Sequence, residues 1–464
     1  MYKSIKELLA NNPVNRPPTI TSADKTKTIP LSYIQKPFWF AQKYIKRLST
    51  SYNTPLTLHF YGKNFSVDIM RDAFNDLVAR HGILRTNFIT QGYKKQPQQI
   101  IRDSLALEIP LLDVKKDQIK LLFSEHINHV FDLANEPLIK IFMLRIKNDH
   151  HIVMINIHHI VTDGWSQGII VRDLKALYNA RLTGEAADLP TLSIQYADYS
   201  VWQHQQSFDT DLAYWQQSLK GYEDDLSMPC DYSSSESQAW HAAVIKYTYP
   251  KSLSRRLSDY CQTQQASLFM GLLTGLAIII ADYADKEDIC ICTTGAGRDK
   301  FELENLIGPF VNVLPMRIDL AENPSFEEVL HTVRRLVLDG FEHQHSNLMN
   351  EPLVKPAYFG QIPLTSIFSR HQNFPRPKIK EWPEGVVIDE ADIEVELERE
   401  WNIPSKLDWQ FLGDGTDLEL NLIYAAELFS KETVECFITH YQQALEILAN
   451  TPQAHLSDRS VSLS

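Results

Sequence analysis

The stretch HIVMINIHHIVTDGWSQ, residues 151–167, changes its pattern half-way along. Its first seven residues, HIVMINI, are almost continuously apolar and predict a strand. Two adjacent histidines, His158 and His159, end the apolar run, and Asp163 and Gly164 follow within five residues of His159. The segment SQGIIVRDLKALYNARL then predicts a helix. The chain therefore carries two histidines out of a strand and into the turn before a helix.

These residue types allow acid–base chemistry, a metal site or a crowded turn. Histidine gains and loses a proton near neutral pH. Adjacent histidines on an extended chain point to opposite faces, so His158 and His159 do not easily reach one metal ion, and we expect no metal. Asp163 can order the turn through a local hydrogen bond or by pairing with an arginine, and Gly164 lets a backbone N–H approach a ligand. A base beside an N–H donor is the equipment of acyl transfer.

The composition sets limits on size and partners. A chain of 464 residues is too long for one ordinary core, so we expect two lobes or domains. Apolar residues make up 44% and charged residues 22%, which is typical of a globular protein. The formal net charge of −13 argues against non-specific binding to nucleic acid or to an anionic membrane surface.

The cysteines and the apolar stretches indicate the cellular compartment in which the protein is located. The cysteines form no CxxC pair and are odd in number, so we expect buried, reduced thiols in a cytosolic protein. They are Cys230, Cys261, Cys290, Cys292 and Cys436. The N-terminus has no apolar core of signal-peptide length, and LFMGLLTGLAIIIA (268–281) is too short to span a bilayer and predicts a buried helix. We therefore expect a cytoplasmic protein without a membrane segment.

The pattern along the chain predicts two α/β lobes with a cleft between them. Residues 1–28 are expected to be a leader or linker, residues 29–187 the N-terminal lobe, residues 188–450 the C-terminal lobe, and residues 451–464 a tail or linker. The acidic segment 381–400 is expected to be mostly a strand of the C-terminal lobe with one solvated face.

Several predicted helices have recognisable N-termini. Ser66 and Ser430 are the expected N-caps of the helices that follow them. Ser325 and Glu328 are spaced as a capping box ahead of a third helix.

Stretches on both sides of the histidines resemble one protein family. HHIVTDGWS (158–166) resembles the HHxxxDG motif of the condensation domains of nonribosomal peptide synthetases, members of the chloramphenicol-acetyltransferase-like superfamily. The other motifs of the family are matched, in order, by LSYIQKPFWF (31–40), RHGILRTNF (80–88), YADYSVWQ (196–203) and IGPFVNVLPMR (307–317). The resemblance covers about residues 29–450.

The resemblance implies an α/β fold of two chloramphenicol-acetyltransferase-like lobes in a V-shaped pseudo-dimer with a central tunnel. Donor and acceptor carrier proteins would bring acyl and aminoacyl groups into the tunnel on phosphopantetheine arms, so the chain would need no cofactor of its own. The acceptor amine would attack the donor thioester, and an amide would form. We expect a monomer that works with two carriers, or with one carrier and a soluble amine.

The resemblance also implies roles for the motif residues. His159 would line the tunnel and orient the acceptor amine, take its proton, or stabilise the charge of the intermediate. His158 would be structural. Asp163 would pair with an arginine and hold the loop, and Gly164 would offer backbone approach near the oxyanion.

Five further residues are candidates for substrate binding: Trp165, Ser166, Arg85, Arg298 and Asn312. Arg298 in AGR is the first candidate partner of Asp163, and Arg85 in LRT is the second. Asn312 would line the cleft between the lobes or cap a turn.

Related families are partly excluded. Heterocyclisation domains replace the first histidine with aspartate, whereas this chain has His158. Epimerisation domains typically have a tryptophan after the motif serine, whereas this chain has Gln167. Two later motifs are weak, at residues 343–354 and 366–375, and Pro309 stands where the family usually has a bulky residue.

Two other functions stay open. One is a free-standing acyltransferase that uses a diffusible amine or alcohol as acceptor. The other is an inactive domain that only docks carrier proteins, against which the intact HHxxxDG set argues. The sequence carries no adenylation or carrier-protein motif, so it is either a discrete protein or a domain cut from a longer synthetase.

Overall fold

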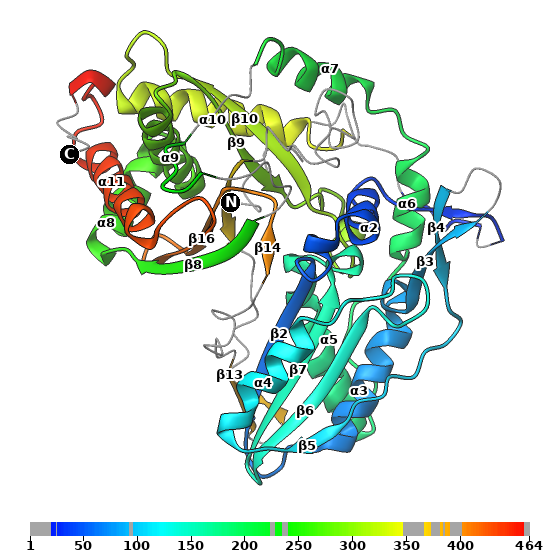
Figure 1. The fold of residues 1–464 in the computed structure, drawn as a ribbon. Coiled ribbons are helices and arrows are strands. Elements are labelled where there is room, and N and C mark those ends of the chain that lie inside the picture. The colour runs from blue at the N-terminus through cyan, green and yellow to red at the C-terminus, as the bar shows by residue number, and fades with distance from the viewer. Residues whose placement is uncertain are drawn as a thin grey trace.

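The protein consists of two halves, each built on a large sheet. The computed structural model describes residues 20–24, 26–91, 96–222, 228–233, 240–346, 366–372, 381–383, 386–389 and 401–458. Figure 1 shows the half formed mainly by the N-terminal part of the chain below the half formed mainly by the C-terminal part.

The N-terminal part of the chain alternates strands and helices. Its elements are β1 (Ile29–Pro30), α2 (Gln35–Tyr44), η2 (Lys46–Leu48), β2 (Asn53–Tyr61), α3 (Val67–Arg80), η3 (Gly82–Arg85), β3 (Thr86–Gln91), β4 (Gln96–Ile101), β5 (Leu111–Asp113), α4 (Lys116–Ile127), β6 (Ile139–Lys147), β7 (His150–His158), η4 (His159–Val161) and α5 (Gly164–Thr183), where η marks a 3₁₀ helix.

The second part of the chain continues in the same mixed pattern. Its elements are α6 (Tyr196–Gln203), α7 (Asp209–Ser218), β8 (Trp240–Thr248), α8 (Lys251–Thr263), α9 (Leu268–Ala284), β9 (Asp288–Gly295), η5 (Phe301–Leu303), β10 (Asn312–Asp319), α10 (Phe326–Glu342), β11 (Ile367–Gln372), β12 (Glu381–Trp382), β13 (Val386–Asp389), β14 (Asn402–Ile403), β15 (Leu407–Gly413), β16 (Leu418–Ala425), α11 (Lys431–Asn450) and η11 (Leu456–Asp458).

The described strands form three sheets. The N-terminal half has a six-stranded sheet in the order β12-β13-β2-β7-β6-β5, and the C-terminal half has a seven-stranded sheet in the order β10-β9-β11-β15-β16-β8-β14. A smaller sheet has the order β1-β4-β3. The mixed α/β architecture predicted from the sequence is confirmed.

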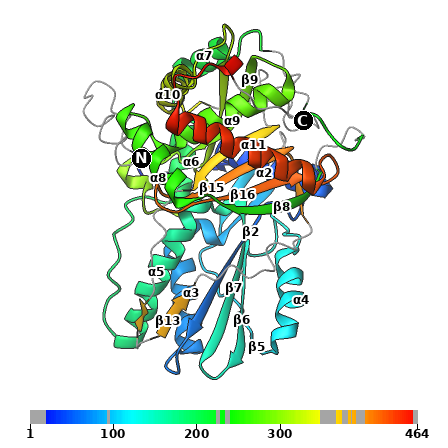
Figure 2. The ribbon, with the colours of Figure 1, turned by 90° about the vertical axis from the view of Figure 1, so that its left-hand side faces the viewer.

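Strand β7, which ends at the histidines, is covered on both faces. Val153, Ile155 and Ile157 belong to the core that β7 shares with α3 and α5. Ile152 and Met154 belong to a separate cluster with α4 on the other face of the sheet. Because both faces are covered, nearly every position of the strand is apolar rather than every second one. Figure 2 shows α4 on one side of β7 and β6, and α3 and α5 on the other.

Helices α8, α9, α10 and α11 share one core with the seven-stranded sheet. Helix α9 is the apolar stretch predicted to be a buried helix, and fourteen of its seventeen residues are buried. Gly275 lets α11 approach α9 closely, because a Cβ atom there would lie 2.7 Å from Leu445 Cδ2. The absence of a side chain at this position therefore sets the packing of the two helices.

The predicted helix N-caps are confirmed. The Oγ atoms of Ser66, Ser325 and Ser430 each accept a hydrogen bond from a backbone N–H in the first turn of the following helix. Glu328 Oε2 accepts a hydrogen bond from the N–H of Ser325 at 2.7 Å, which completes the expected capping box.

The second part of the chain contributes a hairpin to the N-terminal sheet. Strands β12 and β13 pair with each other. Strand β13 also pairs with β2, beside which it lies in Figure 1. The ring of Trp382 packs edge-on against Phe60, with 5.0 Å between the centroids. These strands therefore do not belong to the C-terminal lobe, where the sequence placed segment 381–400, because they supply backbone partners for the edge of β2. Residues 390–400 lie outside the described residues.

Parts of the expected leader and tail pack against the two halves. Ile20 is buried in the N-terminal core, and the N–H of Ala23 donates to Asp198 Oδ1 at 2.8 Å. At the other end, Leu456 is buried in the C-terminal core. Residues 20–24 and 451–458 are therefore folded onto the protein, unlike the linkers expected there.

Ion pairs join the halves in two regions of the part of the chain that the structure describes. One region contains Asp163 and Arg298 and is presented with the candidate site below. In the other, Arg47 Nη2 of η2 lies 2.8 Å from Glu427 Oε1, and Asn402 Nδ2 of β14 donates to the carbonyl oxygen of Arg47 at 2.9 Å.

None of the five cysteines, all of which lie in described segments, is joined in a disulfide, but the expectation that they are buried is wrong for two of them. Cys261, Cys290 and Cys292 are buried, whereas Cys230 and Cys436 are exposed. Cys230 lies outside any helix or strand, and Cys436 lies on the solvent side of α11, between the buried residues Val434 and Phe437.

Within the described residues, no single helix is long and apolar enough to cross a membrane, and α8 with α9 reach that length only as a pair bent by 105°.

Candidate functional site

The two histidines lie where β7 ends at the junction of the halves. His158 is the last residue of β7, and His159 is the first residue of the 3₁₀ helix η4. Thr162 and Asp163 follow, and α5 begins at Gly164. The strand, the turn and the helix predicted from the sequence are all present.

His158 is fully buried and hydrogen-bonded at both ring nitrogens. Its Nδ1 accepts a hydrogen bond from the N–H of Ile160 at 3.0 Å. Its Nε2 lies 3.2 Å from Gln42 Oε1, to which it donates, since the carboxamide oxygen is an acceptor. Burial, followed by the nearby His159, lowers the pKa of His158 to about 3, so the ring is neutral at pH 7. His158 therefore stabilises the turn in one tautomer.

His159 is held by its backbone and by ring stacking. Its N–H donates to the carbonyl oxygen of Tyr52 at 2.7 Å. Its imidazole stacks on the ring of Phe38, with 4.7 Å between centroids and 27° between planes. Its Nδ1 is buried and makes no hydrogen bond with a described residue, while the side chain as a whole is only half-buried. The ring is therefore fixed in place without a partner at Nδ1 among the described residues.

The pKa of His159 is lowered, which favours the neutral imidazole. Burial is the largest cause. The positive charge of Arg370 lowers the pKa further, while the negative charge of Asp163 and nearby backbone carbonyls raise it. A neutral imidazole at pH 7 is able to accept a proton.

Arg370 belongs to the C-terminal half, on β11. Its Nε donates to Asp408 Oδ1 at 3.1 Å, and its Nη2 donates to Asp408 Oδ2. Gln410 Nε2 also donates to Asp408 Oδ2, at 3.1 Å. The seven-stranded sheet thus brings a fixed positive charge close enough to act on His159.

Asp163 caps α5 and is saturated with hydrogen bonds. Its Oδ1 accepts from the N–H of Ser166 at 2.8 Å and from Ser166 Oγ at 2.6 Å. Its Oδ2 accepts from the N–H of Phe310 at 3.1 Å. Arg298 Nη2 lies 3.1 and 3.2 Å from the two carboxylate oxygens. Both possibilities raised by the sequence, a local turn hydrogen bond and an arginine partner, are therefore present together.

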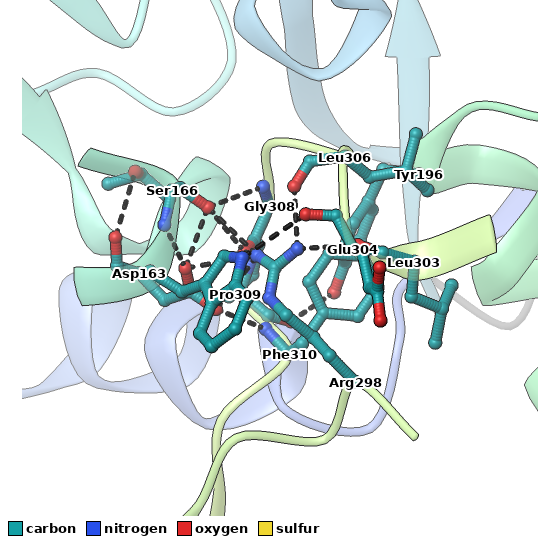
Figure 3. Close-up of polar contacts among 12 residues, drawn as sticks. Asp163, Ser166, Tyr196, Arg298, Leu303, Glu304, Leu306, Gly308, Pro309 and Phe310 are labelled. Carbon is teal, nitrogen blue, oxygen red and sulfur yellow. Dashed lines mark hydrogen bonds and ion pairs between the residues drawn. The ribbon is translucent and has the colours of Figure 1, made fainter. Parts of the chain in front are cut away.

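The guanidinium of Arg298 is the centre of a buried polar cluster between the halves. Nη1 donates to the carbonyl oxygens of Leu303 and Leu306, both at 2.7 Å, and Nη2 also donates to the carbonyl oxygen of Gly308 at 3.2 Å. The guanidinium lies 4.1 Å from the ring centroid of Phe310. Figure 3 shows these contacts around Arg298, together with Asp163 from the turn before α5 and Ser166 from the first turn of α5.

The cluster also ties α6 to the loop that precedes β10. Tyr196 Oη donates to the carbonyl oxygen of Pro309 at 2.6 Å, and it lies 2.7 Å from Ser32 Oγ. Gly308 has φ of +154°, and a Cβ atom there would lie 2.1 Å from Tyr196 Cδ2. The loop therefore passes Tyr196 at a distance that only glycine allows.

Two of the candidate substrate-binding residues, Arg85 and Asn312, make hydrogen bonds within their own halves of the protein. Arg85 is not the partner of Asp163, because its Nη1 donates to the carbonyl oxygen of Arg102 within the N-terminal half. Asn312 donates to the carbonyl oxygens of Gln344 and Ser346, so it ties down the chain after α10.

Two candidates belong to the first turn of α5. Trp165 Nε1 donates to the carbonyl oxygen of Glu304 at 3.1 Å, across the junction of the halves. Gly164 is exposed.

Within the described residues, no group of three or more His, Cys, Asp or Glu side chains comes together as metal ligands would.

Sequence reasoning did not identify Phe38, Gln42 or Arg370 as parts of the site. Phe38 and Gln42 lie in and just after LSYIQKPFWF, which was matched as a motif without roles for its residues. Arg370 lies in the weak motif at residues 366–375. Residues 373–375 of that motif and residues 347–354 of the other weak motif lie outside the described residues.

Comparison with known families gives a consistent match. The family model of the condensation domain matches residues 25–463. A linear gramicidin synthase of Brevibacillus parabrevis is 30% identical over 456 residues, which cover 94% of this chain and 8% of that protein. The dimodular nonribosomal peptide synthase of Bacillus subtilis is 29% identical over 465 residues, which cover 96% of this chain and 19% of that protein. The chain therefore spans a small part of the length of these curated relatives.

Solved structures show the same fold at low sequence identity. The X-domain from teicoplanin biosynthesis is 22% identical with a TM-score of 0.84, and the match covers 96% of this chain and 100% of that one. The first condensation domain of the calcium-dependent antibiotic synthetase, in complex with a substrate analogue, is 16% identical with a TM-score of 0.74, over 94% and 99% of the two chains.

Proposed function

The chain belongs to the condensation-domain family of nonribosomal peptide synthetases, and we propose that it joins a carrier-bound acyl or peptidyl thioester to an amino acceptor through an amide bond. The observation that supports this activity most is the state of His159. The residue is half-buried, its ring is stacked on one face, its pKa is lowered so that the neutral form is favoured at pH 7, and its backbone is anchored to Tyr52.

His159 acts in this proposal as the general base. The nitrogen of the acceptor amine attacks the carbonyl carbon of the thioester, a C–N bond forms, and the C–S bond breaks with its electron pair leaving on sulfur. The proton lost by the amine passes to Nε2 of His159, because Nδ1 is buried, and from there to the thiolate. A lowered pKa supports this role over that of a protonated residue that stabilises negative charge.

Asp163 has a structural role in this proposal. A general base needs a free acceptor site near the substrate, whereas both oxygens of Asp163 are occupied by Ser166, Phe310 and Arg298. The pair instead fixes the start of α5 against the C-terminal half. Gly164, the first residue of α5, would present its N–H to the oxyanion, since the first N–H groups of a helix have no acceptor within it.

The partners in this proposal are a donor and an acceptor carrier protein with phosphopantetheine arms. A tethered substrate gains rate from its effective concentration, so weak docking of each carrier is sufficient. In a variant of this scheme, only the donor is bound to a carrier protein, and the acceptor is an amine in solution.

The donor preference tests the proposal. The chain is mixed with an amine and with the same acyl group presented on a carrier or on coenzyme A, with and without EDTA, and the amide is measured by mass spectrometry. We expect the carrier-bound donor to react faster and EDTA to have no effect. Faster reaction of the acyl-coenzyme A would favour an acyltransferase with diffusible substrates, and no amide from any donor would favour an inactive docking domain.

A further inference from the structure

One face of α2 contacts three successive residues of the histidine loop. Gln35 Nε2 donates to the carbonyl oxygen of Ile160 at 3.1 Å. Phe38 stacks on His159. Gln42 Oε1 accepts the hydrogen bond from His158. The three α2 residues are spaced i, i+3 and i+7, which places them on one face of the helix.

Hydrogen bonds to other segments fix helix α2 at both ends of this face, at Gln35 and at Gln42. Gln35 Oε1 accepts from the N–H of Ser32 at 3.0 Å, and Ser32 Oγ lies 2.7 Å from Tyr196 Oη, beside the buried cluster. Gln42 Nε2 donates to the carbonyl oxygen of Phe131 at 3.0 Å. The helix therefore presents Phe38 from a fixed position. Figure 1 shows α2 at the junction of the two halves.

The two histidines are positioned in different ways. His158 is fixed by hydrogen bonds at both ring nitrogens. For His159, the backbone carbonyls of His159 and Thr162 lie near enough to the ring to raise its pKa, but Nδ1 makes no hydrogen bond of good geometry with a described residue. The ring torsion of histidine is intrinsically broad, so such contacts hold the ring plane only weakly. The ring of Phe38 is stacked on one face of the imidazole and covers that face, which limits rotation of the ring. Phe38 in turn packs edge-on against Tyr52, at 5.0 Å between centroids, and the carbonyl of Tyr52 holds the N–H of His159.

We propose that Phe38 is the positioning residue that fixes the ring plane of His159 toward the acceptor amine. The inference rests on the proposed function of His159. The lone pair of an imidazole nitrogen lies in the plane of the ring, so an aromatic ring over one face leaves Nε2 accessible. The same contact sets the direction from which the amine approaches.

Three variants separate this role from general packing. Phe38→Leu keeps an apolar side chain but removes the stacked ring, and Phe38→Tyr keeps the ring. Phe40→Leu is the matched control, because Phe40 lies on the same helix and its ring packs against Tyr44 at 4.7 Å. The full chain is assayed with loaded carriers, and the imidazole signals of His159 are followed by NMR with labelled histidine, assigned by their absence in His159→Gln.

We expect Phe38→Leu to lower kcat roughly three- to tenfold with KM within about twofold, because an aromatic pair contributes a factor of this size. The His159 ring signals should move as the ring current of Phe38 is lost, and they should also broaden, because the imidazole then samples several ring orientations. Phe38→Tyr should restore both, and Phe40→Leu should change neither.

Two results would overturn the inference. One is a Phe38→Leu variant with wild-type kcat and His159 signals as sharp as those of the wild-type chain, and the other is a Phe38→Tyr variant that loses as much as Phe38→Leu. If the wild-type chain forms no amide, the proposed function fails, and the NMR comparison alone then decides whether Phe38 fixes the ring.

Discussion

Asp163 and Arg298, which are 135 residues apart in the chain, form an ion pair at 3.1 Å in which neither side chain is exposed to solvent. One residue caps α5 in the N-terminal half, and the other follows β9 in the C-terminal half. The pair thus joins the turn that carries His159 to the opposite half of the protein.

We predict that Asp163→Ala destabilises the protein. The substitution removes the helix cap and leaves the buried Arg298 guanidinium without its counter-charge, and breaking a buried pair costs about 3–5 kcal/mol. The free energy of unfolding, measured with urea, should fall by about that amount.

The matched control is Asp76→Ala, which breaks the exposed pair between Asp76 and Arg181. An exposed pair contributes about 1 kcal/mol or less. Equal losses in the two variants would contradict the structural role of Asp163.

Gly308→Ala should be poorly tolerated. The new Cβ would collide with the ring of Tyr196, and the φ of +154° disfavours any side chain. Gly184→Ala is the comparison, because Gly184 has φ of +75° but an added Cβ there would meet no atom within 4 Å. We expect a loss of about 1 kcal/mol at Gly184 from backbone strain alone and a clearly larger loss at Gly308 in the same urea experiment. A smaller loss at Gly308 would show that the loop yields easily.

The pH dependence of the rate should reflect the lowered pKa of His159. The neutral imidazole is the active form of a base. As the pH falls, His159 stays neutral until the pH reaches its lowered pKa in the folded protein. The acid limb of kcat should therefore lie below pH 6.5, the ordinary value for histidine.

Arg370→Gln removes a positive charge that lowers the pKa of His159, so the acid limb should move to higher pH. Arg370→Lys keeps the charge and should keep the limb in place. An acid limb that stays in place, or moves to lower pH, in Arg370→Gln would show that this charge does not lower the pKa of His159.

His158 should make the fold sensitive to acid. Its pKa is about 3 in the folded protein and 6.5 when exposed, so below pH 6.5 the unfolded chain binds a proton that the folded chain does not. The free energy of unfolding should fall between pH 7 and pH 5 by about 2 kcal/mol from this residue. His158→Gln should lose correspondingly less over the same range, and identical slopes for both proteins would contradict the assignment.

The local elements could be predicted from the sequence because each has a local cause. The apolar run before His158 predicts the strand, and the serines at positions 66, 325 and 430 predict three helix starts. Arg298 was the first of two candidate partners for Asp163, and the structure shows this pair. Arg85, the second candidate, instead donates to the carbonyl oxygen of Arg102.

The contacts between elements could not be predicted. The stacking of Phe38 on His159 depends on the docking of α2, and no local pattern encodes it. Likewise, the alternation in a short strand such as β13 shows which faces are apolar, but it does not show which sheet the strand joins.

The most direct measurement is the mass of both carriers after one turnover. An acyl-loaded donor carrier and an aminoacyl-loaded acceptor carrier are mixed with the chain, and intact-mass analysis follows the acyl group from one to the other. With the wild-type chain, we expect the acceptor to gain the mass that the donor loses. His159→Ala should slow this transfer roughly 10²- to 10⁴-fold, the usual contribution of a general base, with an unchanged melting temperature. Transfer by a folded His159→Ala variant within about threefold of the wild-type rate would contradict the role of His159 in amide formation.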